Sequence, residues 1–160
     1  MKPGGQKSKG NTQERKTARA LSDWSGLKMG RNVLTETGDL MTPLVFPFSV
    51  ECKHYAEINF WHIFTSKHSL LEKFWDQASR DAANLTRDWD QRFWPMLSIK
   101  QNRSAWLMGL SKEVVDKAFY DIGLDYISIR VSLATVFFFD FEKVLEAIPY
   151  KTIQTRMRAI

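Results

Sequence analysis

The chain has 160 residues, 44% of them hydrophobic, which is enough for one compact domain with a real core and too little to favour a second domain. The single cysteine, Cys52, excludes an intramolecular disulfide framework and a zinc cluster built from cysteines. The most apolar run, residues 131–141, is much shorter than the ~20 residues of a membrane helix, and no N-terminal stretch resembles a signal peptide. We therefore expect a cytoplasmic protein without membrane contact.

The formal net charge of +5 is concentrated at the N-terminus. Residues 1–20 hold six basic side chains and one acidic side chain, so the remainder of the chain is close to neutral. Basic side chains clustered in this way can hold a phosphate backbone. The alternative is a solvated, disordered tail over residues 1–10. Five basic side chains are candidates for nucleic-acid contacts: Lys7, Lys9, Arg15, Lys16 and Arg19.

The first third of the chain predicts an arm, a helix and a strand. Residues 1–10 contain almost nothing to bury and are expected to form a flexible basic arm. Asn11, with Glu14 three positions later, fits a capping box that opens a helix over residues 11–24. Apolar residues then alternate with polar ones over residues 27–35, which predicts a half-buried strand.

The middle of the chain predicts a hairpin over residues 39–55. The aromatic-rich residues 56–68 have no clean period and no assigned structure. Helical spacing of apolar residues predicts a long helix over residues 69–91. Two strands follow, at residues 96–100 and 105–110.

The last third predicts a helix capped by Ser111 and closed by Gly123, then a strand from residue 127 that runs into the three phenylalanines 137–139. A short helix from Asp140 ends at Pro149. This order of elements predicts an α/β fold, with a central mixed β-sheet flanked by helices and a single domain over residues 11–160.

The chemically informative residues lie in the predicted hairpin. Asp39 is followed, after eleven residues, by Glu51 and Lys53. Side chains two apart on a strand point the same way, so Glu51 and Lys53 share one face, while Val50 and Cys52 belong to the core face. A hairpin of this length can bring Asp39 beside them, and the result is an acidic pocket with one lysine.

Such a pocket suits phosphodiester chemistry. Two carboxylates with backbone and water oxygens are the ligands that Mg²⁺ prefers, since it binds oxygen and keeps several waters. A lysine beside them can lower the proton affinity of an attacking water and offset the charge that develops on phosphorus.

At these residues the sequence resembles the PD-(D/E)xK nuclease superfamily, and it is similar to the superfamily's archaeal and phage-encoded Holliday-junction resolvase branch. That branch adds an acid within a Glu-Arg pair near the start of the first helix, and Glu14-Arg15 is such a pair. The resemblance implies a restriction-endonuclease-like core and a homodimer that cuts four-way DNA junctions by paired nicks. It also implies Mg²⁺ as cofactor, with Mn²⁺ as a substitute, and the host cytoplasm if the protein is phage-encoded.

By this resemblance Asp39 and Glu51 hold the metal together with the backbone carbonyl of Cys52, Lys53 assists the nucleophile, and Glu14 completes the site. Gln77 occupies roughly the place of a polar helix residue that some members of the superfamily use near the metal. The motif departs from its name at one position, because Gly38 stands where proline is expected.

Several of these residues also fit purely structural roles. Glu14 is equally a partner of the Asn11 cap, and Gln77 can be an ordinary amide on a helix surface. The three histidines, His54, His62 and His68, lack the spacing of helix-face ligands and are expected to be structural or surface residues. The aromatic residues Phe60, Trp61 and Phe64 favour burial over base stacking.

The expected function is therefore a Mg²⁺-dependent endodeoxyribonuclease that acts on branched DNA. One alternative is another PD-(D/E)xK nuclease, of nicking, exonucleolytic or restriction type, because substrate choice lies in loops and in the dimer surface. The other is a DNA-binding protein without activity, in which Asp39, Glu51 and Lys53 are surface charges.

Overall fold

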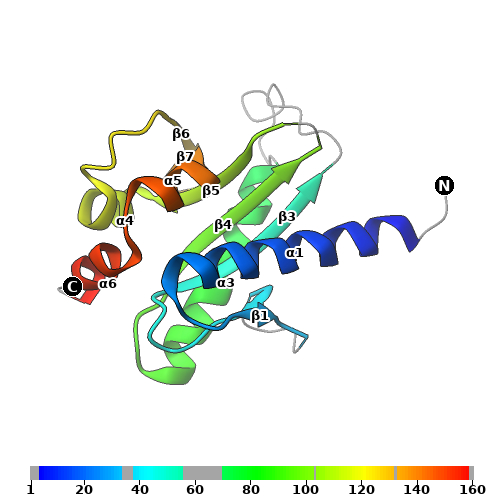
Figure 1. The fold of residues 1–160 in the computed structure, drawn as a ribbon, viewed down its shortest axis with the longest axis horizontal. Coiled ribbons are helices and arrows are strands. Elements are labelled where there is room, and N and C mark those ends of the chain that lie inside the picture. Colours follow the sequence, from blue (N-terminus) through cyan, green and yellow to red (C-terminus); the bar gives the residue numbers. More distant parts are fainter. Residues whose placement is uncertain (1–3, 34–37, 56–69, 103, 132, 159–160) are drawn as a thin grey trace.

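The computed structural model describes residues 4–33, 38–55, 70–102, 104–131 and 133–158, the first seven of these as backbone only. Its centre is a five-stranded sheet with the strand order β3-β4-β5-β7-β6. Only β3 and β4 pair in parallel, and the other neighbours are antiparallel, so the sheet is mixed (Figure 1). The strands are β3 (Phe48–Tyr55), β4 (Trp94–Gln101), β5 (Trp106–Ser111), β6 (Tyr126–Val131) and β7 (Ala134–Asp140).

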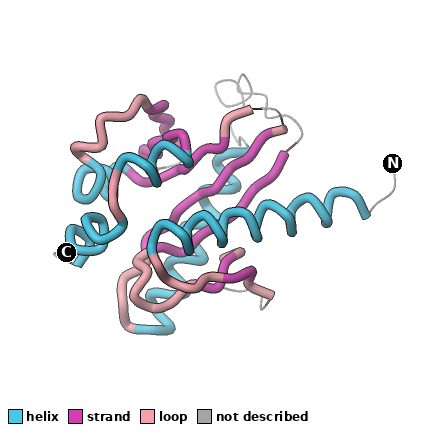
Figure 2. Tube along the Cα trace, in the orientation of Figure 1, coloured by secondary structure: helices cyan, strands magenta, loops and turns pink. Residues whose placement is uncertain are grey.

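Helices cover both faces of this sheet, as Figure 2 shows. One core cluster joins α1, α5 and α6 to one face, and a second joins α3 to the other. The α/β class with a central mixed sheet flanked by helices, expected from the sequence, is therefore confirmed. The helices are α1 (Gly4–Ser25), α3 (Leu70–Trp89), α4 (Lys112–Val114), the π-helix η1 (Val115–Phe119), α5 (Phe141–Ala147) and α6 (Tyr150–Arg158).

A polar contact fixes α1 on the sheet. The hydroxyls of Thr17 and Ser98 are 3.0 Å apart, and both residues are fully buried. The indole Nε1 of Trp106 donates to the same Ser98 oxygen at 2.8 Å. Because buried polar groups need such partners, these contacts select one placement of α1 against β4 and β5.

The predicted start of the first helix is wrong. α1 begins at Gly4 rather than Asn11, so the backbone of residues 4–10, predicted to be a flexible arm, is helical here. Asn11 consequently lies inside a helix and cannot be its N-cap. The capping-box role of Glu14 fails with it, since a cap must precede the first turn.

The predicted hairpin over residues 39–55 is also wrong. β2 (Leu40–Met41) pairs with β1 (Gly30–Arg31) in a separate two-stranded ladder, and β3 pairs in parallel with β4. Of the strand predicted over residues 27–35, the described part, residues 27–33, is strand only at β1, and residues 34 and 35 lie outside the described residues. Parallel neighbours need a long crossover, and α3 lies in that connection between β3 and β4.

Two further differences lie near the C-terminus. The strand predicted to run from residue 127 through the phenylalanines is two antiparallel strands, β6 and β7, and α6 follows Pro149 where no helix was predicted. The long helix α3, the strands β4 and β5, and the Ser111 cap agree with the prediction, the Ser111 hydroxyl accepting from the Val114 amide. Within the described ranges, no helix combines the length and apolarity that crossing a membrane requires.

Candidate active site

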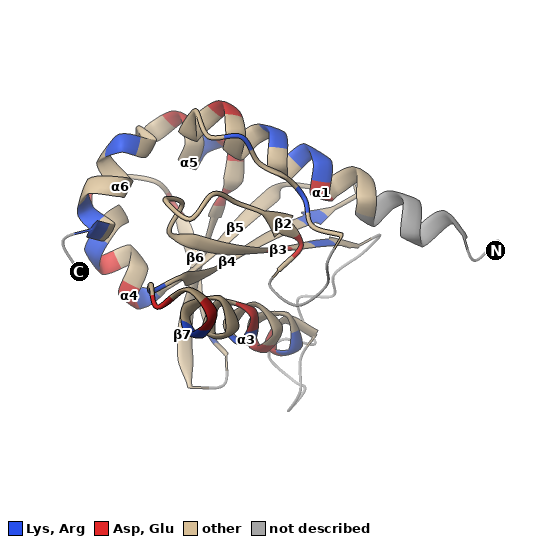
Figure 3. Cartoon of the chain, turned by 90° about the horizontal axis from the view of Figure 1, so that it is seen from below, with Lys and Arg blue, Asp and Glu red and all other residues tan. Residues whose placement is uncertain are grey.

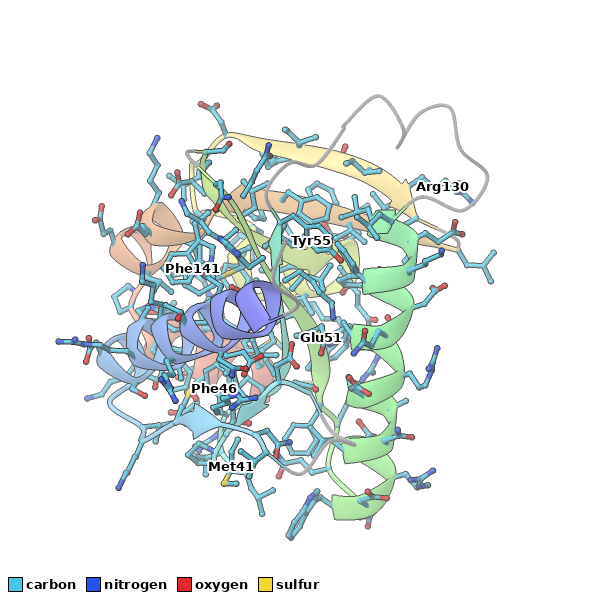
Figure 4. The ribbon with its side chains drawn as sticks, turned by 90° about the vertical axis from the view of Figure 1, so that its right-hand side faces the viewer. Met41, Phe46, Glu51, Tyr55, Arg130 and Phe141 are labelled. Atoms are coloured by element: carbon cyan, nitrogen blue, oxygen red, sulfur yellow. The ribbon has the colours of Figure 1, made fainter. Side chains whose placement is uncertain are left out.

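The candidate site is built on β3. Its residues alternate as predicted, with Val50 and Cys52 in the core under α1 and with Glu51 and Lys53 on the face covered by α3. That second face is not open to solvent, however, because Glu51 is only 1% exposed. Figure 4 shows Glu51 between α1 and α3. A carboxylate is thus held in a largely dehydrated position.

Lys53 joins β3 to α3. Its Nζ donates to Glu51 Oε1 and, at 3.1 Å, to Gln77 Oε1, and it lies 5.5 Å from the centre of the Phe74 ring. Burial lowers the pKa of Lys53, but the hydrogen bond and charge of Glu51 outweigh it and leave the pKa above its ordinary value. The ammonium group is therefore a permanent cation that three neighbours hold in place.

Asp39 is locked to β3 through backbone contacts on either side of Glu51. Its amide donates to the Val50 carbonyl at 2.9 Å, and its Oδ2 accepts from the Cys52 amide at 2.7 Å. Gly38 precedes it with a φ of +94°, a conformation closed to proline. The glycine in place of the motif's proline is therefore a requirement of this backbone.

Glu14 reaches the same region from α1, where it forms an ion pair with Arg31 of β1. It is one of several polar residues around a cavity of about 230 Å³ that opens between α1, α3 and β3. The cavity is lined by Glu14, Arg31, Asn32, Val33, Gly38, Asp39, Glu51, Gln77 and Asp81. The structure thus brings together the predicted residues Glu14, Asp39, Glu51 and Gln77, and Lys53 touches two of them.

Asp81 is the one acidic side chain on this cavity wall that sequence reasoning missed. It follows Gln77 by four residues, and that spacing places both on one face of α3. Burial and the nearby Asp39 raise the pKa of Asp81. The helical spacing from Gln77 was a usable signal, but it gains meaning only once α3 is known to pack beside Asp39.

The charges of the site are unbalanced. Burial, followed by the charge of Asp39, raises the pKa of Glu51 from 4.5 to about 7, although the hydrogen bond from Lys53 lowers it. The second oxygen, Glu51 Oε2, is buried and has no hydrogen-bond partner. A buried carboxylate oxygen without a partner, facing another carboxylate, is the donor set that a hard cation would satisfy.

A metal here would have few protein ligands. Among the residues that the structure describes, no three His, Cys, Asp or Glu side chains are grouped as a metal site. Two carboxylates and the Cys52 carbonyl remain, and Mg²⁺ tolerates this because it usually keeps several waters. The donor chemistry therefore fits magnesium better than a metal that demands a full protein cage.

The side chain of Cys52 takes no part in the site, although its backbone amide donates to Asp39. Cys52 is buried, and burial raises the pKa of its thiol, so it is not a nucleophile. His62, His68 and the aromatic residues 60, 61 and 64 lie outside the described residues. Arg15, Lys16 and Arg19 are exposed on α1, whereas the side chains of Lys7 and Lys9 are not described. Figure 3 shows basic positions along α1. Their contacts with DNA stay a prediction.

A mixed sheet with a buried Glu-x-Lys strand beside an Asp defines the class of protein, the PD-(D/E)xK nucleases. A family model described as "Phage putative PDDEXK endonuclease" matches residues 5–155, and the chain belongs to that family. Among solved structures, the chain is similar to Archaeoglobus fulgidus Hjc, a Holliday junction resolvase from an archaeal hyperthermophile. The identity is 13%, the TM-score is 0.43, and the match covers 92% of this chain and 96% of that one. No curated protein matches the chain.

Proposed function

We propose that this nuclease is a Mg²⁺-dependent endonuclease that hydrolyses phosphodiester bonds in branched DNA, making paired nicks in four-way junctions as a homodimer in the cytoplasm. The observation that carries the metal-dependent chemistry is the unpartnered oxygen of Glu51, buried beside Asp39 and Lys53. The preference for branched DNA rests on the sequence motif, with Glu14-Arg15 ahead of the Asp and the Glu-x-Lys.

In this proposal Asp39 and Glu51 hold Mg²⁺ together with the Cys52 carbonyl, and Mn²⁺ substitutes for it. The bound ion would supply a Lewis acid and an activated water. The carboxylate of Asp39 is already oriented, because its Oδ2 accepts a hydrogen bond from the Cys52 amide. Ionisation of Glu51 is unfavourable because the carboxyl group is buried, and a cation beside Oε2 would offset that free-energy cost.

Lys53 acts on the phosphate. Glu51 and Gln77 hold its ammonium group, so this hydrogen-bond donor is oriented before the substrate binds. A preorganised cation of this kind stabilises negative charge that develops on the phosphoryl oxygens, and it needs no rearrangement during the reaction. Gln77 positions the lysine, and Arg31 positions Glu14 at the cavity wall.

The test uses an end-labelled four-way junction beside a linear duplex of the same sequence, with Mg²⁺, Mn²⁺ or EDTA. We expect symmetric, metal-dependent nicks in the junction alone. Lys53→Ala should bind the junction without cutting it, and the matched variant Lys143→Ala, which removes an exposed lysine on α5, should cut normally. Removal of a preorganised charged donor typically lowers the rate by roughly 100-fold or more.

Each other outcome decides against part of the proposal. Cutting of both DNAs would move the protein to a general, nicking or restriction-type nuclease of the same superfamily. Digestion from the ends would indicate an exonuclease. Binding without cutting under either metal would leave a DNA-binding protein without activity. Calorimetric titration of Mn²⁺ into wild type and Glu51→Gln gives a readout that does not depend on cleavage, and the variant should bind more weakly.

A further inference from the structure

One edge of the central sheet is unpaired within the part of the chain that the structure describes. β6 pairs with β7 on one side, and no described strand pairs with its other side. Figure 1 shows β6 and β3 at opposite sides of the sheet. An open edge presents a row of free backbone donors and acceptors, which is a template for pairing with another strand.

The side chains on β6 are unusually apolar for an open edge. Tyr126 is 56% exposed and Ile127 is 54% exposed, although they point to opposite faces of the sheet. Ile129 packs against the core cluster under α3, and Ile127 continues the same row beyond it. The apolar layer under α3 therefore extends to the edge at β6, where none of the described residues pairs with it.

We propose that two copies of this chain join through β6, antiparallel, with Ser128 on the two-fold axis, so that the two sheets become one. This inference rests on the proposed function in one respect only, namely that the dimer serves to make two paired incisions. The interface itself is argued from the strand.

The sequence of β6 is complementary to itself in that register. A two-fold axis through Ser128 places Ile127 opposite the partner's Ile129, which buries apolar surface on the face under α3. It also places Tyr126 opposite the partner's Arg130, a pairing of an aromatic ring with a cation. Arg130 is exposed and forms no ion pair among the described residues, so it is free to make this contact.

The arrangement also places the two catalytic centres. A two-fold axis perpendicular to the sheet keeps each face on its own side, so both copies of Glu51 lie on the face covered by α3. Glu51 is on β3, at the far edge of each sheet. Nine interstrand steps of about 4.8 Å separate the two β3 strands, or roughly 43 Å before the twist of the sheet shortens the path. A substrate cut twice must therefore span both ends of the joined sheet.

The first experiment measures mass in solution by light scattering and sedimentation over a range of concentrations. Six residues form a short ladder, so we expect a dimer whose fraction grows with concentration. Ile127→Glu places a charge opposite the partner's Ile129 in each of the two symmetry-related apolar pairs and should give a monomer. Val45→Glu, which changes a 49% exposed side chain on a loop, is the matched control and should remain dimeric. A monomeric wild type, or equal dimer fractions for both variants, would overturn the interface.

The second experiment tests the register. Paired residues on antiparallel strands have Cα atoms about 4.5–5.5 Å apart, within the range of a disulfide, so Ser128→Cys should cross-link the dimer on mild oxidation. Arg130→Cys would lie about 13 Å from its own copy and should not cross-link. Cys52 is present in both variants, and because it is buried it should not form the cross-link itself. In a dimeric protein, cross-linking at residue 130, or at neither position, would show that the contact lies elsewhere. Finding that residues 56–69 or a different protein cover the edge of β6 would also overturn the interface.

The proposed interface and the proposed nuclease activity can be rejected independently. Monomeric Ile127→Glu should still bind Mn²⁺ and should nick one strand of a junction without the paired second nick. A dimer that joins through Ser128 but cuts no DNA would reject the proposed function and keep the interface. Paired nicks by a monomeric Ile127→Glu would reject the interface and keep the function.

Discussion

Gly38 decides where Asp39 points. Its φ of +94° is accessible to glycine and strained for other residues, and an added Cβ would lie 3.0 Å from both Ser49 Oγ and the Val50 carbonyl oxygen. The glycine allows the chain to approach β3 closely enough for Asp39 to bond on both sides of Glu51. The backbone conformation at Gly38 therefore also sets the position of Asp39, the proposed metal ligand.

Gly38→Ala should accordingly destabilise the protein by about 1–3 kcal/mol and weaken Mn²⁺ binding, because the strained backbone displaces Asp39. Urea unfolding and calorimetry measure the two effects. Gly30→Ala is the matched control, since a Cβ at Gly30 meets nothing within 4 Å, and it should leave both quantities nearly unchanged. Equal effects of the two substitutions would show that the close approach at Gly38 is unimportant.

The raised pKa of Glu51 predicts how stability depends on pH in metal-free buffer. The folded pKa of about 7 lies above the ordinary value of 4.5, so the folded protein binds an extra proton between these values. This contribution to stability is complete below 4.5 and is lost as the pH rises through about 7. Wild type should therefore become less stable over that range, by an amount on the order of 2 kcal/mol.

Glu51→Gln removes the ionisation and keeps the shape, so at pH 8 without metal it should be more stable than wild type. Adding Mg²⁺ at pH 8 should raise the melting temperature of wild type and leave that of the variant unchanged, because ligand binding stabilises only a protein with its site intact. Glu142→Gln, at an exposed position on α5, is the control and should match wild type throughout. A wild type whose stability rises from pH 5 to 8 would contradict the assignment.

At the scale of elements, the contact of α1 with the sheet depends on Ser98. Ser98→Ala would leave the buried Thr17 with one contact fewer and the half-buried Trp106 indole without its acceptor. We expect a loss of about 1–3 kcal/mol in the free energy of unfolding, measured in urea, since buried donors without partners are costly. Thr155→Ala, which removes an exposed hydroxyl bond on α6, should cost much less.

Elements whose pattern is local were predicted well. α3 buries Leu71, Phe74, Trp75 and Ala78 at helical spacing, and the sequence carries that spacing openly. The prediction merged β6 and β7 into one strand because the alternation of apolar and polar residues continues across residues 132–134, where no glycine, proline or asparagine marks a turn. A hairpin of two similar strands has the same period as one long strand, so only the pairing of β6 with β7 separates them.

For the whole molecule, the distribution of charge predicts how DNA is held. Replacing Arg15, Lys16 and Arg19 by Gln should weaken binding of junction DNA and of linear duplex alike, because contacts with phosphates carry no sequence information. The slope of log affinity against log salt should fall by up to about 0.9 for each lost phosphate contact. The control changes three other lysines together for the same loss of charge: Lys112, Lys143 and Lys151. Equal loss with both triple variants would indicate general charge attraction rather than an α1 surface.

The sequence by itself determined the class of fold, the long helix α3 and the shared face of Glu51 and Lys53, because each follows from the periodicity of neighbouring residues. Only the tertiary structure decided that β3 pairs in parallel with β4, that Arg31 meets Glu14, and that Asp81 lines the cavity. These contacts join segments far apart in the chain, and no local pattern reports which distant segment packs against which. The start of α1 at Gly4 was not predicted either, because the local capping pattern at Asn11 gave the wrong boundary.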